Sequence, residues 1–532
     1  MGTRYRFIDL ATISTEVDLL EAIAPPASPM QTFALYGQSQ EPMKHVLETL
    51  KAIGTLTLLI QDKVRDPDFL AEHEVFYGKQ HRTVARLCIR LHAFSRTTPT
   101  LADPKNPTAA ETLAFLDGIP EGSNQYLGFV TIRPLRHAPV GASILKPPAN
   151  AGVTCHETFP VHIAGRDFEV EGTPYLQQDN AVGACAQASI WIALRTQMKR
   201  VGNTAYTPAE LTLSATRYLA TDRVFPGRQG LVIQQMLEAI RSSGHDPLTL
   251  DFGGDVSIPT LASEVMEEAL PYVESGLPVI ASLFPPSGGH AVVMIGRRFS
   301  GTQLVTTPHK TSPLNIQYAL ASDWAAELAI HNDNTGPYVT LASGDHGSND
   351  YCLEHTQSLI VPLPETVFLT AKEAERSALK SLTYICIIRS GLETTATLRS
   401  TPEVDIVLRT CLVQRHAFRK WALEDADMDA DLKTAYRTFE LPRLIWVVEV
   451  HNQKLFNPSD PDNRSRIGEF LIDASADSLH GDATLCAHIT KHAFPSYQGP
   501  AGLLLQVNDL PPEEMAILNT GELGKSLARP WA

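Results

Sequence analysis

The chain has 532 residues, of which 43% are hydrophobic and 19% are charged, and its formal net charge is −15 at pH 7. This composition excludes wholesale disorder and a fibrous architecture, and at about 100–200 residues per domain the length predicts roughly three domains. The negative charge, without a dense run of Lys or Arg, also argues against nucleic acid or a membrane surface as a partner, because both attract positively charged proteins.

The N-terminus and the cysteines indicate the cellular compartment of the protein. Asp9 comes before any apolar stretch, and no run of about 18 apolar residues follows, so the sequence predicts neither an export signal nor a membrane span. Seven cysteines, an odd number without a CxxC pair, do not suggest a disulfide scaffold or a zinc site. We therefore expect a cytoplasmic protein with no cofactor and no metal, and the oligomeric state stays open.

The first part of the chain, residues 1–165, is predicted as a mixed α/β module of unknown role. Val46, Leu50 and Ile53 keep helical spacing, and residues 87–93 alternate with the period of a strand. The other expected features are a strand over residues 126–133 and loops over residues 97–107 and 139–148.

The central part, residues 166–350, is predicted to place helices before strands. A helix begins near Cys185, and two further helical patterns end close to Gly244 and Gly276, residues suited to a helix C-terminus. These two helices are expected over residues 233–240 and 266–273, followed by strands over residues 277–283, 290–297 and 328–331. Helices followed by strands are typical of an α+β domain.

The last part, residues 351–532, is predicted as another α+β module of unknown role, in which we recognise no chemistry. Its expected elements are strands over residues 384–388, 404–413, 444–450 and 470–472 and a helix over residues 430–436. The whole chain is thus predicted as a multi-domain α+β protein, with a central domain flanked by two mixed α/β modules.

Two groups of residues have spacings that metal ligands use. His488 and His492 lie four apart near Cys486, and Cys352 lies three residues before His355. No second Cys or His pair completes a tetrahedral site for either group. A core or surface role is therefore the favoured interpretation for both.

Cys185 is the candidate nucleophile. A polar stretch ends in Gly183-Ala184, and an apolar helical pattern begins at the cysteine. At a helix N-terminus, unpaired N–H groups and the helix dipole favour a thiolate and so lower the pKa of the thiol. Gln178, seven residues upstream and preceded by Gln177, could join the backbone N–H of Cys185 in holding the oxyanion of a tetrahedral intermediate.

His290 is the candidate base, because it follows two glycines at the start of an apolar strand. The third member of a triad must accept a hydrogen bond from the imidazole nitrogen that faces away from the thiol. A turn after a later strand offers Asn332, Asp333 and Asn334 for this role. We favour Asp333 and keep Asn332 and Asn334 as alternatives.

The region around these residues resembles the papain-like cysteine peptidase superfamily, and in detail the bacterial C39-like peptidases. The features that carry the resemblance are a Gln upstream of a Cys that opens a helix, the helical stretch 230–241, the strand 276–280, and the Gly-Gly-His strand from residue 288 with a later Asn/Asp turn. The resemblance implies a papain-like fold for residues 166–350. It also implies a triad of Cys185, His290 and Asp333, with Gln178 in the oxyanion hole.

These residues predict a cysteine peptidase that hydrolyses peptide bonds of a protein or peptide substrate through a thioester. Two alternatives stay open. The same triad could transfer the acyl group to an amine, as in transglutaminase-like crosslinking, or deamidate a protein glutamine. The central domain could also be a catalytically inactive scaffold that binds protein partners.

Overall fold

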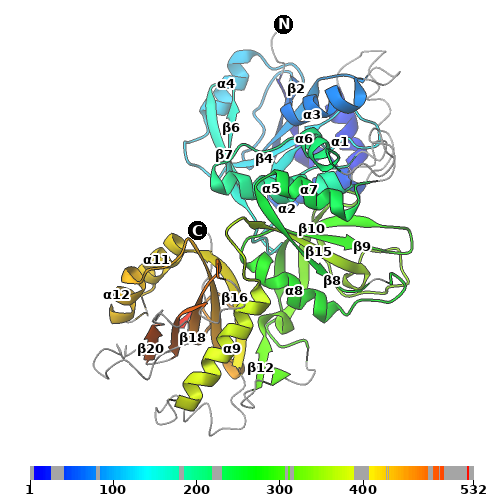
Figure 1. Ribbon diagram of the computed structural model, residues 1–532. Helices are drawn as coiled ribbons and strands as arrows, with labels where there is room; N and C mark the ends of the chain where they lie inside the picture. The colour runs from blue at the N-terminus through cyan, green and yellow to red at the C-terminus, as the bar shows by residue number, and fades with distance from the viewer. Residues whose placement is uncertain are drawn as a thin grey trace. The chain divides into compact units, whose positions relative to one another are not determined.

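A computed structural model gives the fold of the chain (Figure 1). It describes residues 5–24, 41–78, 84–178, 185–218, 230–253, 255–305, 310–311, 317–388, 406–426, 428, 430–476, 483–489, 492–495 and 524–525. These residues form helices and three β-sheets, which confirms the predicted α+β class. Within the same residues, no helix combines the length and the apolar composition needed to cross a membrane.

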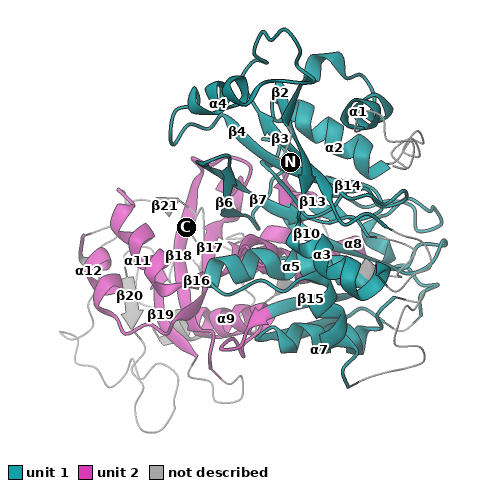
Figure 2. Ribbon diagram, turned by 90° about the horizontal axis from the view of Figure 1, so that it is seen from above, with its two compact units in different colours: residues 1–259, 278–296, 329–362 teal, residues 260–277, 297–328, 363–532 magenta. Residues whose placement is uncertain are grey.

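The chain divides into two compact units (Figure 2). Unit 1 comprises residues 1–259, 278–296 and 329–362, and unit 2 comprises residues 260–277, 297–328 and 363–532. The chain therefore leaves each unit and returns to it. The three modules expected from the sequence, 1–165, 166–350 and 351–532, follow chain order instead, and they stay a prediction.

The first sheet of unit 1 has seven strands in the order β1-β2-β3-β4-β5-β7-β6, all paired antiparallel. The strands are β1 (Tyr5–Asp9), β2 (Thr57–Val64), β3 (Cys88–Phe94), β4 (Tyr126–Ile132), β5 (Ser143–Leu145), β6 (Glu157–Ile163) and β7 (Arg166–Tyr175). The accompanying helices are η1 (Leu10–Thr12), α1 (Glu16–Ile23), α2 (Glu41–Ala52), α3 (Pro67–Glu72), the π-helical turn η3 (His73–Tyr77) and α4 (Ala109–Asp117). Both α1 and α4 begin with a capping box, which satisfies backbone N–H groups of the first turn.

The second sheet of unit 1 has six strands in the order β14-β13-β10-β9-β15-β8. The strands are β8 (His245–Asp251), β9 (Val279–Leu283), β10 (His290–Phe299), β13 (Ala325–Asn332), β14 (Gly336–Leu341) and β15 (Thr356–Pro364). The helices of this part are α5 (Cys185–Val201), α6 (Pro208–Ala215), α7 (Ile233–Ser242) and η5 (Leu353–His355). Strand β9 pairs antiparallel with β10 on one side and with β15 on the other.

One hydrophobic cluster runs through both sheets of unit 1. It contains Leu58 and Val130 of the first sheet, Val293 of the second, and Trp191 and Leu194 of α5, all of them buried. Burial of side chains this large contributes about 1.5–3 kcal/mol each. Because α5 shares this core with both sheets, packing fixes its position relative to β10.

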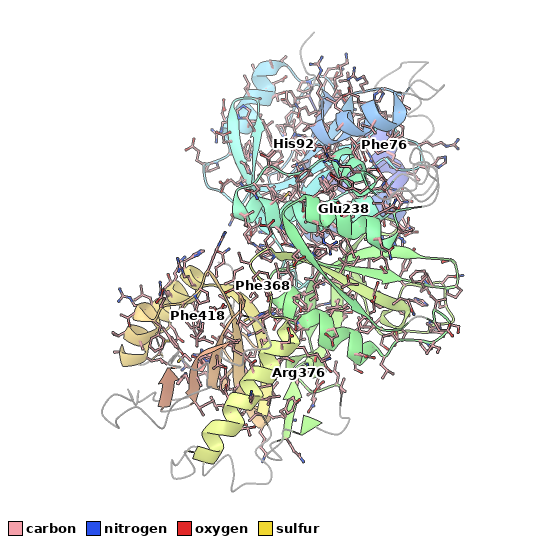
Figure 3. All side chains as sticks on the ribbon, viewed as in Figure 1. Phe76, His92, Glu238, Phe368, Arg376 and Phe418 are labelled. Carbon is pink, nitrogen blue, oxygen red and sulfur yellow. The ribbon has the colours of Figure 1, made fainter. Side chains whose placement is uncertain are left out.

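Unit 2 is built on one eight-stranded sheet in the order β11-β12-β16-β17-β18-β19-β20, with β21 paired to β18. The strands are β11 (Lys310–Thr311), β12 (Gln317–Leu320), β16 (Ile406–Gln414), β17 (Leu444–Asn452), β18 (Arg464–Asp473), β19 (Thr484–Ile489), β20 (His492–Pro495) and β21 (Gly524–Lys525). The helices are α8 (Ala262–Glu274), η4 (Ala321–Trp324), α9 (Ala371–Ile388), α11 (Arg415–Glu424), α12 (Ala430–Thr438) and η6 (Gln453–Leu455). Phe418 of α11 is fully buried in a cluster with α12 and the sheet (Figure 3).

Most elements expected from the sequence are present. The structure confirms the expected helices as α2, α5, α7, α8 and α12 and the expected strands as β3, β4, β9, β10, β13, β16, β17 and β18. Gly244 and Gly276 follow α7 and α8 with φ values of +77° and +69°, a conformation in which glycine lacks the Cβ clash of other residues.

Two predictions were wrong. Residues 384–388, expected as a strand, form the end of helix α9. Its earlier residues Ala374, Ala378 and Leu382 recur every four positions and are buried, so helical packing overrides the local strand preference. The expected loop 139–148 contains the short strand β5, which pairs with β4 and β7.

Candidate active site

His290 is the first residue of β10 and lies opposite Leu283 of β9. Gly288 has a φ of +118°, and a Cβ at Gly289 would lie 3.1 Å from the ring of Phe284. The two glycines before the histidine therefore serve a turn and a close approach, respectively. His290 is 8% exposed, and this burial lowers the pKa of its imidazole although the contact with Asn332 raises it.

The hydrogen bonds of Asn332 define the tautomer of His290. The backbone N–H of Asn334 donates to Asn332 Oδ1 at 2.9 Å, so this atom is the acceptor end of the amide. His290 Nε2 lies 2.9 Å from the same oxygen and must therefore donate to it. In the neutral imidazole, Nδ1 then keeps the lone pair that can accept a proton.

The neighbourhood of His290 Nδ1 is formed by Asn334 and Tyr351. Asn334 Nδ2 lies 3.4 Å from Nδ1 and also donates to Tyr351 Oη at 3.2 Å. The Tyr351 ring lies 4.8 Å from the imidazole, centroid to centroid, at an interplanar angle of 30°. The side-chain amide of Asn334 thus donates to the lone pair in the resting site, and an incoming thiol proton has to replace it.

Asp333 is buried next to the imidazole without a hydrogen bond to it. Its Oδ1 lies 3.3 Å from His290 Nε2, the residue is 3% exposed, and neither carboxyl oxygen has a hydrogen-bond partner among the described residues. Burial raises the pKa of this carboxyl well above its ordinary value. Burial therefore favours the protonated, uncharged form of the Asp333 carboxyl beside the histidine.

All three candidates for the orienting residue thus surround the imidazole. Asn332 accepts from Nε2, Asp333 lies slightly farther from the same nitrogen, and Asn334 contacts Nδ1. The preference for Asp333 over the other two stays a prediction, but the shortest contact with Nε2 belongs to Asn332.

The turn that carries these residues is tied to strand β7. Tyr175 Oη donates to the backbone carbonyl of Asn332 at 3.3 Å. His331, fully buried, lies with Nε2 3.2 Å from the carbonyl oxygen of Thr173 and accepts with Nδ1 from the N–H of Tyr338 at 3.1 Å. Burial lowers the pKa of His331 to about 3, so it stays neutral and works as a fixed hydrogen-bonding group.

Helix α5 begins at Cys185, as the sequence predicts, and contacts the start of β10. Ser189, one helical turn after Cys185, donates its hydroxyl to the carbonyl of Ala291 at 3.1 Å. Residues four apart lie on the same helix face, so Cys185 belongs to the face that contacts the neighbour of His290. Residues 179–184 and the side chain of Cys185 lie outside the described part of the structure.

On the side of α5 that faces α3, two side chains contact the buried carboxyl of Asp68. Trp191 Nε1 donates to Asp68 Oδ1 at 3.3 Å, and Arg195 Nη1 lies 3.3 Å from the same oxygen. Burial raises the pKa of Asp68 to about 6, although Arg195 lowers it. Helix α3, which carries Asp68, is thereby fixed to α5.

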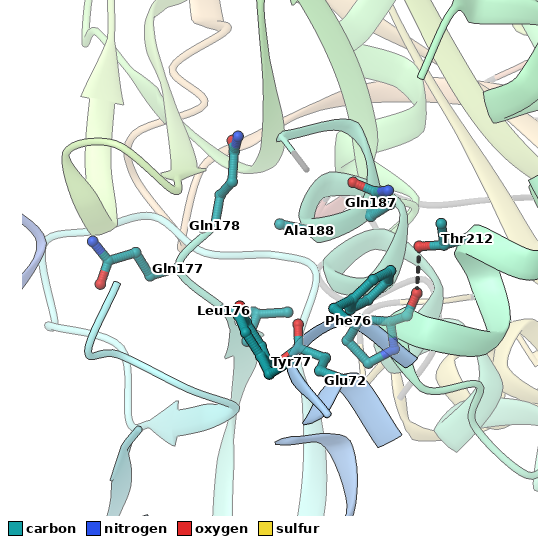
Figure 4. A pocket seen from close by; sticks show the side chains of 10 residues that line it. Glu72, Phe76, Tyr77, Leu176, Gln177, Gln178, Gln187, Ala188 and Thr212 are labelled. Carbon is teal, nitrogen blue, oxygen red and sulfur yellow. Dashed lines mark hydrogen bonds between the residues drawn. The ribbon is translucent and has the colours of Figure 1, made fainter. Parts of the chain in front are cut away.

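Gln177 and Gln178 point in different directions at the end of β7 (Figure 4). Gln177 Oε1 accepts from the N–H of Val140 at 3.0 Å, and its Nε2 donates to the carbonyl of His137 at 3.4 Å, so this amide is occupied. Both residues line a pocket that also contains residues of α5. The oxyanion role of Gln178 stays a prediction.

The pocket beside Gln178 has an empty volume of about 340 Å³, including its open mouth. Its wall includes Glu72, Phe76 and Tyr77 from α3 and η3, and Gln187 from α5. The sequence contained no signal for it, because its walls come from segments more than 100 residues apart.

Glu72 is the ionisable group of this pocket. Arg133 Nη1 lies 3.0 Å from Glu72 Oε2, and the same guanidinium donates to the carbonyl of Gln177 at 2.5 Å. Burial raises the pKa of Glu72 to about 7, although Arg133 lowers it. The Glu72–Arg133 pair therefore carries at most one net positive charge and, when Glu72 is ionised, none.

A second cysteine–histidine pair lies at residues 352 and 355. Cys352 Sγ is 3.4 Å from His355 Nδ1, and His355 Nε2 lies 3.0 Å from the carbonyl oxygen of His346. Burial and Glu354 raise the pKa of the Cys352 thiol to about 11, so it is a thiol and not a nucleophile at neutral pH. Both residues are buried, in keeping with the core role favoured from the sequence.

Unit 2 contains a buried row of ionic groups that sequence reasoning missed. Strand register places Arg409, Glu449, Glu469 and His488 opposite one another on β16, β17, β18 and β19. All four are at most 7% exposed. The spacing along each strand gives no hint of this row, because it arises from the register between four strands.

Contacts between side chains link the members of this row. Arg409 Nη1 lies 3.2 Å from Glu449, His488 Nδ1 lies 3.1 Å from Glu469, and Tyr436 donates a short hydrogen bond to Glu469. Among the described residues, no group of His, Cys, Asp and Glu is arranged to hold a metal ion. We interpret the row as a structural network of unit 2.

Comparison of the chain with known protein families and with curated proteins finds no match.

Proposed function

We propose that the chain is a papain-like cysteine peptidase, related in design to the C39-like peptidases, in which Cys185 is the nucleophile and His290 the base. The observation that carries the proposal is the hydrogen bond from His290 Nε2 to Asn332 Oδ1, because it leaves the Nδ1 lone pair free of a proton. The contact of Ser189 with Ala291 supports it further, since it brings the Cys185 face of α5 to the start of β10.

In the first half of the proposed reaction, His290 Nδ1 accepts the thiol proton of Cys185, and the sulfur forms a bond to the carbonyl carbon of the substrate. The tetrahedral oxyanion accepts hydrogen bonds from the amide of Gln178 and the backbone N–H of Cys185. The imidazolium then returns the proton to the leaving nitrogen. The carbon–nitrogen bond breaks, and an acyl thioester stays on Cys185.

In the second half, water replaces the amine. His290 Nδ1 removes a proton from the water molecule, whose oxygen attacks the thioester carbon. The carbon–sulfur bond breaks, the sulfur regains the proton from His290, and the carboxylic acid leaves. Throughout, Asn332 keeps Nε2 as the donor, so that Nδ1 is the only nitrogen that exchanges a proton.

Selective alkylation tests the proposal. Limiting iodoacetamide, followed by peptide mass spectrometry, should label Cys185 faster than the other six cysteines of the chain. His290→Ala should abolish this preference. His355→Ala is the matched control, because it removes the histidine beside the buried thiol of Cys352 and should leave the labelling of Cys185 unchanged.

Equal labelling of all seven cysteines would contradict the nucleophile assignment. The reaction itself is tested by incubating the protein with a peptide library and reading the products by mass. A cleaved backbone is the expected result. An intact backbone that gains a crosslink, or a mass increase of about one dalton from deamidation, would replace hydrolysis by acyl transfer or deamidation at the same residues.

A further inference from the structure

The turn after β13 carries two asparagines that differ in their freedom to rotate. Asn332 is 1% exposed, and its Oδ1 accepts from the N–H of Asn334 and from His290 Nε2, so its amide keeps one orientation. Asn334 is exposed, and its contacts with His290 Nδ1 and Tyr351 Oη both involve the same nitrogen, Nδ2. Half a turn of this exposed amide exchanges Nδ2 for Oδ1 at the same place.

Tyr351 lies in the segment between β14 and β15, next to this amide. Two residues later, Leu353 is 1% exposed and donates its N–H to the carbonyl of Ala342 at 2.9 Å, which fixes the backbone at this end of the segment. The ring of Tyr351 lies 4.8 Å from the imidazole of His290, centroid to centroid, and its Oη accepts from Asn334 Nδ2 at 3.2 Å. A tyrosine hydroxyl both donates and accepts, so it is a partner for either end of the amide.

The two protonation states of His290 need different partners at Nδ1. In the neutral imidazole Nδ1 accepts, and Asn334 Nδ2 donates to it at 3.4 Å. Once Nδ1 carries a proton it is a donor and opposes the N–H groups of the amide. Half a turn brings Asn334 Oδ1 to this place, where it accepts from Nδ1–H while the hydroxyl of Tyr351 donates to the same oxygen. Because hydrogen bonds from a charged donor are about twice as strong as neutral ones, the amide stabilises the imidazolium more than the neutral ring.

The other groups around the imidazole act at its other nitrogen. Among the described residues, Asp333 and Tyr351 are the titratable side chains seen in contact with the ring, and Asp333 Oδ1 lies 3.3 Å from Nε2. Burial lowers the pKa of His290, so its charged form is poorly stabilised. An acceptor at Nδ1 therefore acts on the nitrogen that exchanges the proton in the proposed reaction.

We propose that Tyr351 is a positioning residue for the proposed base: its hydroxyl holds the Asn334 amide beside His290 Nδ1 in either orientation. The amide then donates to the neutral imidazole and, after half a turn, accepts from the imidazolium. Tyr351 thus acts through Asn334, which would leave Nδ1 for solvent without this anchor. The proposal rests on the proposed function for its setting, since it takes His290 to be the group that accepts the thiol proton.

Titration of His290 by NMR tests the proposal on the intact protein. The histidines are labelled with ¹³C at Cε1, and the signal that is missing in His290→Gln identifies His290. Tyr351→Phe keeps the ring and removes the hydroxyl, and it should lower the pKa of His290 by about half to one unit. In peptide cleavage, the acid limb of kcat/KM should move down by the same amount, and kcat should fall about 2- to 10-fold with KM unchanged.

A double-mutant cycle tests whether Tyr351 acts through Asn334. Asn334→Leu removes the amide at an exposed position and should lower the pKa of His290 about as much as Tyr351→Phe does. The double variant should show no further shift, because the hydroxyl then has no amide to hold. Tyr126→Phe is the matched control: it removes a tyrosine hydroxyl that lies 3.0 Å from the imidazole of another histidine, His92, and it should leave the titration of His290 unchanged.

An unchanged pKa of His290 in Tyr351→Phe would overturn the proposal, and so would additive shifts in the double variant. A raised pKa would also overturn it, because it would mean that the amide only blocks the lone pair of Nδ1. Failure of the proposed function has a different signature: no peptide is cleaved and Cys185 is not selectively alkylated. The NMR titration needs neither result, so coupled shifts in the two single variants would uphold the role of Tyr351 at His290 without the peptidase.

Discussion

The neighbours of His290 lead to a prediction that separates Asn332 from Asp333. Asn332→Ala removes the acceptor of the imidazole N–H, whereas Asp333→Asn replaces an acid whose uncharged form burial favours by a neutral amide of the same size. We expect the first variant to lose activity and the second to keep it. This ranking opposes the usual expectation that the acidic residue is the essential third member of a triad.

The magnitudes follow from the contacts. Loss of the acceptor leaves a buried neutral donor unpaired, which costs about 1–3 kcal/mol, or a fall of about 5- to 150-fold in kcat/KM. Burial favours the uncharged acid at Asp333, and Asp333→Asn leaves the hydrogen bond from Nε2 to Asn332 in place, so a fall below about threefold is expected. An ionised Asp333, 3.3 Å from Nε2, would instead stabilise the imidazolium, and its removal would cost of the order of 10⁴-fold.

The assay is the pH dependence of peptide cleavage, with selective alkylation of Cys185 as an independent readout. Burial lowers the pKa of His290, and the hydrogen bond with Asn332, which Asp333→Asn leaves in place, is what counters this shift. The acid limb of kcat/KM should therefore fall at the same pH in wild type and Asp333→Asn. A displaced acid limb together with a large loss of activity in Asp333→Asn, and a mild effect of Asn332→Ala, would refute the assignment.

Two further predictions concern stability. In unit 1, burial raises the pKa of Glu72 from 4.5 to about 7. Between these two pH values the native state keeps a proton that the unfolded chain releases. The free energy of unfolding should therefore fall by up to about 3 kcal/mol as the pH rises from 4.5 through 7. Denaturation at pH 5 and pH 8 should show this loss in wild type and not in Glu72→Gln. In unit 2, burial raises the pKa of Glu469, but the charge of Arg466 and the contacts with His488 and Tyr436 outweigh it and hold the value at about 2. Its contribution is present above pH 4.5 and lost as the pH falls toward 2, and Glu469→Gln should cost about 3–5 kcal/mol at pH 7. An unchanged urea midpoint at pH 7 would contradict this.

Local patterns in the sequence predicted the elements that carry the proposed dyad. The apolar run after Gly288 and Gly289 predicts β10, and helical spacing after Cys185 predicts α5; both elements are present with nearly the expected starts. These signals are strong because periodicity and glycine conformation are properties of a single segment. The helix at residues 384–388 was missed for the complementary reason, since its strand-like residues end a helix whose packing is decided by residues earlier in the chain.

The sequence could not predict the features that depend on strand register or on contacts between segments far apart in the chain. The run Asn332-Asp333-Asn334 offers three acceptors, and only the exact end of β13 decides which one meets Nε2. The pocket joins Glu72 and Gln187 from separate parts of the chain. The ionic row of unit 2 needs the alignment of four strands. A one-residue shift in any of these registers would turn the side chains to the other face, which no single-segment pattern can specify.

Hydrogen bonds between uncharged groups hold the proposed base in place. The turn after β13 is bound to β7 through Tyr175 and His331, and the same turn presents Asn332 Oδ1 to the imidazole. Burial favours the uncharged form of both Asp333 and His331, and burial also lowers the pKa of His290, which only the hydrogen bond with Asn332 raises. A base with a lowered pKa stays unprotonated at neutral pH and accepts a thiol proton readily, but stabilises the resulting imidazolium weakly. The oxyanion donors of the proposed site must therefore supply much of the stabilisation of the transition state.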